Sequence, residues 1–93
     1  MIVGSLRVRL LVRGSRSLKD KRQVVRSIKD RLRNQFNVSV AEVDDQDMWQ
    51  RATLAVAYVS GSSRHANEVI SKALDFIEDN VDGYVTNIET EIW

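Results

Sequence analysis

The chain has no cysteine, no proline and a single histidine, and each shortage excludes a class of structure or site. Without cysteine there is no disulfide and no thiolate metal site. His65 alone provides neither a metal centre nor a pair of nucleophile and base. The absence of proline suits a chain that is almost entirely regular structure. We therefore expect no cofactor, no metal ion and no catalytic activity.

Long apolar runs are absent as well. No stretch approaches the ~20 apolar residues that cross a bilayer. An alternating pattern follows Met1 at once, so we expect no signal peptide. The chain has 93 residues, of which 43% are hydrophobic, so we expect one folded domain over residues 1–93. We also expect it to be cytoplasmic and to make no membrane contact.

Charge is distributed unevenly along the chain. Residues 1–36 hold 11 of the 14 Lys and Arg residues and only two acidic residues, whereas residues 37–93 hold three cations and 11 acidic residues. The formal net charge of +1 therefore conceals a basic first part and an acidic second part. A basic surface of this kind favours a polyanionic partner.

The spacing of apolar residues predicts six elements. Period-two alternation and β-branched residues predict strands at residues 2–13, 38–44, 52–60 and 84–93. Helical spacing predicts a helix at residues 18–35 and a second one that follows residues 61–63 and ends near residues 80–83. In the last strand we expect Tyr84, Ile88 and Ile92 on the same side. Ser17 and Asp20 have the spacing of a helix N-terminal cap.

This order of elements, βαββαβ, is that of the α+β ferredoxin-like fold. Because crossover connections are right-handed, we expect an antiparallel sheet in the order 4-1-3-2 with both helices on one face. The first and last strands are then neighbours. We therefore expect Arg7 and Arg9 to lie near Glu89 and Glu91 on the helix-free face and to pair with them.

The turn before the first helix is a candidate anion site. A helix N-terminus presents unpaired N–H groups and a positive dipole end. Hydroxyl groups and cations in and beside the turn would complete a phosphate site: Arg13, Ser15, Arg16, Ser17 and Lys19. The alternative is a purely structural turn in which Ser17 caps the helix. The carboxylate of Asp20 would compete there with a bound anion.

Five cations recur along the first helix at spacings of three, four, three and four residues, which places them in one stripe: Lys19, Arg22, Arg26, Lys29 and Arg33. We call these five residues the basic stripe. It is a candidate track for phosphates, and the alternative is a solvated helix flank. The strands lack the paired aromatic residues on which RNA-recognition modules stack bases, so binding would depend on charge and shape.

The acidic turn lacks the spacing and the glycine of a calcium loop, and it consists of Glu42, Asp44, Asp45 and Asp47. We interpret it as a solvated hairpin turn without a metal ion.

The run Gly-Ser-Arg-Ser-Leu-Lys-Asp-Lys-Arg at residues 14–22, taken with residues 36–43, 49–52 and 64–66, resembles the YlxP-like family of small bacterial proteins, a domain of unknown function. The resemblance covers nearly the whole chain and implies a ferredoxin-like fold. Members of the family are often encoded among genes for translation initiation and ribosome maturation, which implies a role near ribosomes or RNA. The family assigns no catalytic residue.

Three functions are open at this point. The first is a non-enzymatic binding protein that uses the first helix and its preceding turn on RNA or a ribosomal particle. The second is a protein-interaction module, such as a homodimer, that uses an apolar part of the helix-free face, namely Leu11, Ala55, Ala57 and Val59. The third is an acylphosphatase-like phosphohydrolase, although residues 52–57 lack an asparagine to position water.

Overall fold

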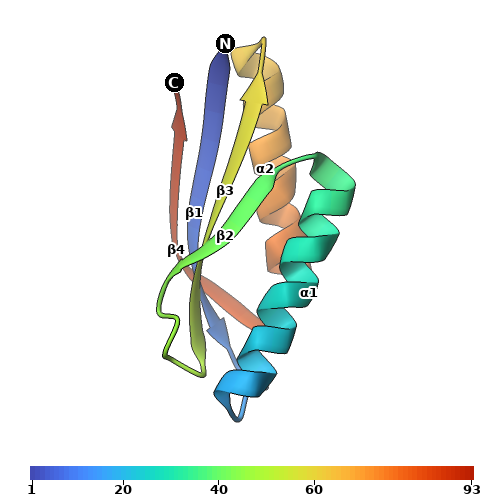
Figure 1. Ribbon diagram of the computed structural model, residues 1–93. Coiled ribbons are helices and arrows are strands. Elements are labelled where there is room, and N and C mark those ends of the chain that lie inside the picture. Colours follow the sequence, from blue (N-terminus) through green and yellow to red (C-terminus); the bar gives the residue numbers. More distant parts are fainter.

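Six elements follow one another along the chain in the computed structural model, which describes residues 1–93 (Figure 1). They are β1 (Ile2–Val12), α1 (Leu18–Phe36), β2 (Ser39–Asp44), β3 (Arg51–Ser60), α2 (Ser63–Asn80) and β4 (Gly83–Ile92). The strands form one antiparallel sheet in the order β2-β3-β1-β4. The predicted topology and strand order are therefore confirmed.

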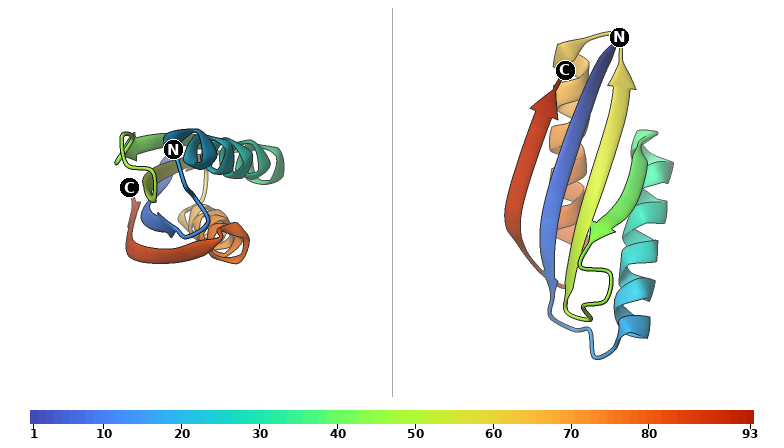
Figure 2. Two further views of the ribbon diagram at one scale, coloured as in Figure 1. Left: turned by 90° about the horizontal axis from the view of Figure 1, so that it is seen from below. Right: turned by 60° about the vertical axis from the view of Figure 1, so that its left-hand side comes forward.

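Both helices cover the same face of the sheet (Figure 2). Helix α2 packs on β1, β3 and β4, whereas α1 packs on β2 and β3. Alternate residues of β1 and β3 point toward the helices and are buried against their apolar faces. Each fully buried aliphatic side chain stabilises the fold by about 1.5–3 kcal/mol. The core residues with almost no exposed surface include Leu6, Val8, Leu10, Leu54, Val56, Ile28, Leu32, Ile70 and Ile77.

Capping residues mark where the helices begin and end. Ser17 accepts a hydrogen bond from the backbone N–H of Asp20 at 3.1 Å, which confirms the predicted cap of α1. Ser62 accepts one from the N–H of His65 at 3.3 Å at the start of α2. Asn37 ends α1 in the left-handed conformation, with φ of 49°.

A bulge in β4 changes which of its side chains share a face of the sheet. The register with β1 shifts between Arg9 and Leu10, so that Tyr84 lies opposite Leu11 and Ile88 lies opposite Val8. Val8 is buried beneath the helices, whereas Leu11 belongs to the other face, so Tyr84 and Ile88 lie on opposite faces. The prediction that they share a side is wrong, because simple alternation does not anticipate the extra residue.

Glycine is required at the start of β4. Gly83 has a φ of 152°, and a Cβ at this position would collide with the carbonyl oxygen of Leu11. Only glycine therefore fits at the position where the chain leaves α2 and begins to pair with β1.

The ion pairs of β1 differ from the prediction. Arg7 does lie opposite Glu89, but Arg9 lies opposite Asn87. The guanidinium groups turn the other way, toward the end of β2, where Arg7 lies 3.7 Å from Asp44 and Arg9 lies 3.6 Å from Asp45. The predicted pairs with Glu89 and Glu91 are therefore wrong, because the end of β2 and the loop after it bring competing carboxylates to the same arginines.

Candidate functional site

The turn between β1 and α1 uses most of its polar groups internally. The side chain of Ser15 is buried and donates a hydrogen bond to the carbonyl of Ser17 at 3.0 Å. The carboxylate of Asp20 accepts from the backbone N–H of Arg16 at 3.2 Å. The N–H of Arg16, just before the helix, and that of Asp20, within its first turn, are thus satisfied by the chain itself, which supports the structural interpretation of Ser15 and Ser17.

Arg13 and Gly14 face the start of β4. The guanidinium carbon of Arg13 lies 5.2 Å from the ring centroid of Tyr84, within range of a cation–π contact. A Cβ added to Gly14 would lie 2.6 Å from a carboxylate oxygen of Asp82, so glycine allows that carboxylate to approach the turn. Arg16, by contrast, is exposed, and its guanidinium group contacts no acidic partner.

The basic stripe lies along one flank of α1. Lys19, Arg22 and Arg26 are exposed, and Lys29 is half-buried. None of the four takes part in an ion pair or a side-chain hydrogen bond. The structure thus brings the predicted cations together and leaves four of them free for a partner.

Arg33, the last residue of the basic stripe, is engaged within the fold. It donates to the carbonyl of Val40 at 2.9 Å and lies 3.6 Å from Asp30. Because β2 is an edge strand, this hydrogen bond covers one of its outward carbonyls. Arg33 therefore ties α1 to the sheet and contributes less free charge than the other members.

Lys21 is the functional group that the sequence prediction missed. Its side chain is completely buried, and its ammonium group has three acceptors: Glu42 at 2.8 Å, the carbonyl of Asp45 at 2.8 Å and the carbonyl of Gln46 at 3.1 Å. The three donors of the ammonium group are therefore all used. The signal was present, because Lys21 lies between Leu18 and Val25 at the helical spacing of the apolar face.

The acidic turn is held by contacts rather than solvated throughout. Glu42 pairs with Lys21, and Asp44 lies near Arg7. Asp45 accepts a hydrogen bond from Thr53 at 2.8 Å and adopts the left-handed conformation, with φ of 63°. These contacts engage three of the four carboxylates of the turn, and no group of three or more His, Asp or Glu residues in the structure converges on a metal position.

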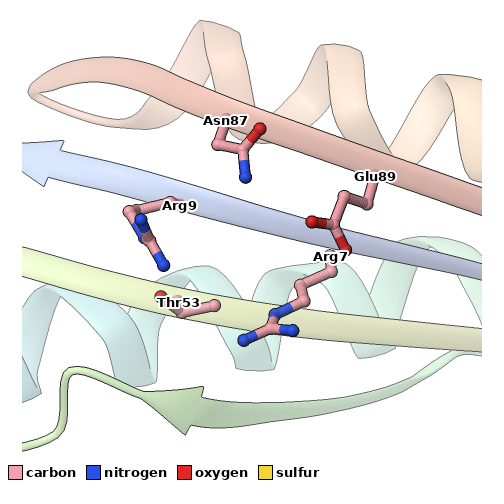
Figure 3. Close-up of a pocket in the computed structure, with 5 residues that line it drawn as sticks. All are labelled: Arg7, Arg9, Thr53, Asn87 and Glu89. Atoms are coloured by element: carbon pink, nitrogen blue, oxygen red, sulfur yellow. The ribbon is translucent and has the colours of Figure 1, made fainter.

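A small polar hollow lies on the helix-free face of the sheet (Figure 3). It has a volume of about 80 Å³ and is lined by Arg7, Arg9, Thr53, Asn87 and Glu89. The Nε of Arg9 is buried there without a hydrogen-bond partner. Charges of both signs line this hollow, so it suits water or a small polar group better than a strongly charged ligand.

Beside it, the same face is partly apolar. A shallow groove of about 250 Å³ is lined by Ser5, Arg7, Ser39, Ala41, Ala55 and Ala57, together with Leu6 and Val56. Val59 is 61% exposed near one end of the sheet. Aromatic base-stacking residues are absent from the centre of this face. Neither helix is long and apolar enough to pass through a bilayer.

Solved structures that are similar to this chain share its fold. A de novo designed protein with a ferredoxin fold, LFR1 1, superposes with a TM-score of 0.60 at 12% identity, covering 100% of this chain and 84% of that chain. The structural-genomics protein YJCS has a TM-score of 0.55 at 7% identity, covering 96% of both chains. Protein Atu4242 from Agrobacterium tumefaciens has a TM-score of 0.53 at 11% identity, covering 98% and 90%. At these identities the likeness establishes the fold alone.

Sequence similarity identifies the family. An uncharacterized protein of Bacillus subtilis (strain 168), YlxP, is 35% identical over 77 residues, which cover 83% of this chain and 84% of that protein. Residues 3–90 match the family described as a protein of unknown function, DUF503. The chain therefore belongs to the DUF503 family of proteins of unknown function.

Proposed function

We propose that this protein is a non-enzymatic RNA-binding protein that holds the phosphate backbone of structured RNA, such as that of a ribosomal particle, along the basic stripe. The observation that carries the proposal is the unpaired state of Lys19, Arg22, Arg26 and Lys29. Cations without an internal partner are the ones that gain most from a polyanion, because no ion pair must first be broken.

The other cations of the basic first part provide the contrast. Arg7, Arg9 and Lys21 pair with carboxylates of the acidic turn. Arg31 donates to Asn80 at 2.7 Å and lies over the ring of Phe76. Within α1, the cations without a partner are thereby gathered on one flank of the helix, and Arg16 in the preceding turn is unpaired as well.

The shape of this flank suits several phosphates of one backbone. Lys19 and Lys29 are ten residues apart on α1, which corresponds to about 15 Å along a helix axis. A hollow of about 250 Å³ lies at the start of the stripe and is lined by Lys19, Arg22, Gln23 and Arg26. Three cations around one hollow favour a phosphate group there, and Lys29 extends the track.

The mode of binding follows from what the sheet lacks. Its helix-free face presents Thr53, Ala55 and Ala57 in the central strand β3, where bases have no aromatic ring on which to stack. Recognition therefore depends on phosphate positions and on the shape of the RNA rather than on base sequence.

The test is a salt series of binding to structured ribosomal RNA fragments. Four phosphate contacts predict a slope of about −3 to −4 for log affinity against log salt concentration. The triple replacement R22E/R26E/K29E is expected to abolish measurable binding at salt concentrations where the unaltered protein binds. Failure of the unaltered protein to bind at low salt overturns the proposal.

The chain offers a matched control. The three cations outside residues 1–36 are Arg51, Arg64 and Lys72, all exposed. The replacement R51E/R64E/K72E changes the net charge by the same amount and leaves α1 untouched. It is expected to weaken binding far less than R22E/R26E/K29E, and equal losses would show that overall charge rather than the stripe controls affinity.

A further inference from the structure

The two edges of the sheet are protected unequally. Strand β2 spans only residues 39–44, and side chains cover its outward carbonyls: Arg33 donates to Val40, and Gln46 donates to Glu42 at 3.3 Å. Strand β4 spans residues 83–92, contains no Lys, Arg or Pro, and receives no side-chain hydrogen bond on its outer backbone groups. No other element lies along its outer side (Figure 2). Proteins often blunt such an edge with Lys or Pro, both of which are missing here.

The open backbone groups of β4 can be assigned. Val3 and Trp93 exchange both of their backbone hydrogen bonds, at 2.6 and 2.9 Å, so the N–H and C=O of Trp93 point toward β1. Pairs alternate along an antiparallel ladder. The groups of Glu91 and Glu89 therefore also point inward, and those of Ile92, Thr90 and Ile88 point outward. The bulge beside Arg9 and Leu10 leaves residues 87–92 as the regular part of this edge.

The side chains of this segment alternate between two chemistries. Glu89 and Glu91 lie on the helix-free face, opposite Arg7 and Ser5, and neither forms an ion pair. Ile88 and Ile92 lie on the helix side and are 44% and 39% exposed. An added strand would therefore meet carboxylates on one face and apolar side chains on the other.

We propose that residues 87–92 bind an extended, basic segment of another protein as a fifth strand, with cations at alternate positions facing Glu89 and Glu91 and apolar residues packing beside Ile88 and Ile92. Main-chain hydrogen bonds to Ile88, Thr90 and Ile92 hold the segment, and its alternating side chains provide specificity. This site is independent of the proposed RNA interface on α1.

A second copy of the chain fits this edge poorly. Antiparallel self-pairing centred on Glu89 or Glu91 sets that residue against itself, and centring on Thr90 sets Glu89 against Glu91. Like charges directly opposite each other destabilise a strand pair. Centring on Ile88 leaves only a few regular residues before the bulge at Thr86 is reached. Charge complementarity therefore favours a basic partner.

The test uses a synthetic hexapeptide of alternating lysine and valine, blocked at both ends, and the full chain labelled with ¹⁵N. Peptide addition is expected to slow hydrogen exchange at the amides of Ile88, Thr90 and Ile92, because these N–H groups gain acceptors. The amides of Glu89 and Glu91, which already point to β1, should change little. No change at the three outward amides with up to about 1 mM peptide overturns the proposal.

Charge and backbone contributions are separated by variants. E89K/E91K is expected to lower peptide affinity by about tenfold or more, because two attractions become repulsions. The matched control is D75K/E78K, which makes the same charge change at exposed positions of α2 and should keep most of the affinity.

A peptide methylated on alternate backbone nitrogens should bind at least about tenfold more weakly. Equal binding of the methylated peptide, or protection of the outward amides by dimerisation without peptide, contradicts the proposal.

Discussion

At the scale of the residue, Lys21 is a buried charge that ties α1 to the loop between β2 and β3. It enters the apolar face of α1 and carries its ammonium group to the loop between β2 and β3. Taking this charge out of water costs several kcal/mol, which the carboxylate of Glu42 and two carbonyls offset only because every donor is used. The same contact orders the loop whose Asp44 and Asp45 attract Arg7 and Arg9.

Replacing Lys21 should therefore destabilise the protein strongly. We expect K21A to lower the free energy of unfolding by about 3 kcal/mol, because it leaves Glu42 and two carbonyls without their donor. Urea unfolding followed by circular dichroism measures the change. The neighbouring exposed lysine provides the control, since K19A should alter the free energy by less than about 0.5 kcal/mol. Equal effects of the two variants would contradict the structural role of Lys21.

At the scale of the element, α1 presents different chemistry on its separate faces. Val25, Ile28 and Leu32 face the core, and the basic stripe occupies an adjoining flank. At its N-terminus, Ser17 and Asp20 satisfy backbone N–H groups that a bound anion would otherwise use. The structure thereby separates the free cations of the helix from its cap.

The hydroxyl of Ser17 provides a test of that separation. We expect S17A to lower the free energy of unfolding by about 1 kcal/mol, as S62A should for α2, because each removes an N-terminal cap. RNA affinity at fixed salt should be the same in both variants and in the unaltered protein. A loss of affinity confined to S17A would instead assign this hydroxyl to the anion site.

Sequence patterns predicted the elements well because hydrophobic periodicity is a local property. They predicted the basic stripe for the same reason, since helical spacing alone places its members together. They did not predict that Arg33 is engaged with Val40, or that Lys21 is buried, because both contacts depend on where β2 and its loop lie relative to α1. Arg7 and Arg9 pair with Asp44 and Asp45 rather than with Glu89 and Glu91 for the same reason.

At the scale of the whole molecule, the two proposed surfaces lie at opposite edges of the sheet. Helix α1 lies on the side of β2, whereas β4 forms the other edge (Figure 2). The surfaces also have opposite charge, with free cations on α1 and free carboxylates on β4. A basic segment and an RNA would therefore be attracted to different edges, and each surface repels the ligand of the other.

Independent surfaces predict a double dissociation. R22E/R26E/K29E should lose RNA binding and keep peptide binding within about twofold, because the altered residues lie far from β4. E89K/E91K should bind the peptide at least about tenfold more weakly and keep RNA binding. Fluorescence anisotropy with labelled RNA and labelled peptide measures both affinities on each variant. If either variant lost both activities while remaining folded, the two surfaces would not be separate sites.

The sequence by itself determined the six elements, their order, the ferredoxin-like topology and the line of cations on α1, because these depend on residue spacing within single segments. Only the tertiary structure decided which charges are free. Lys21, Arg33 and Arg9 find partners on distant segments, whereas Lys19 and Glu91 find none. The ion pairs of Lys21, Arg7 and Arg9 depend on how the end of β2 and its loop come within about 4 Å of distant residues, which no local pattern encodes.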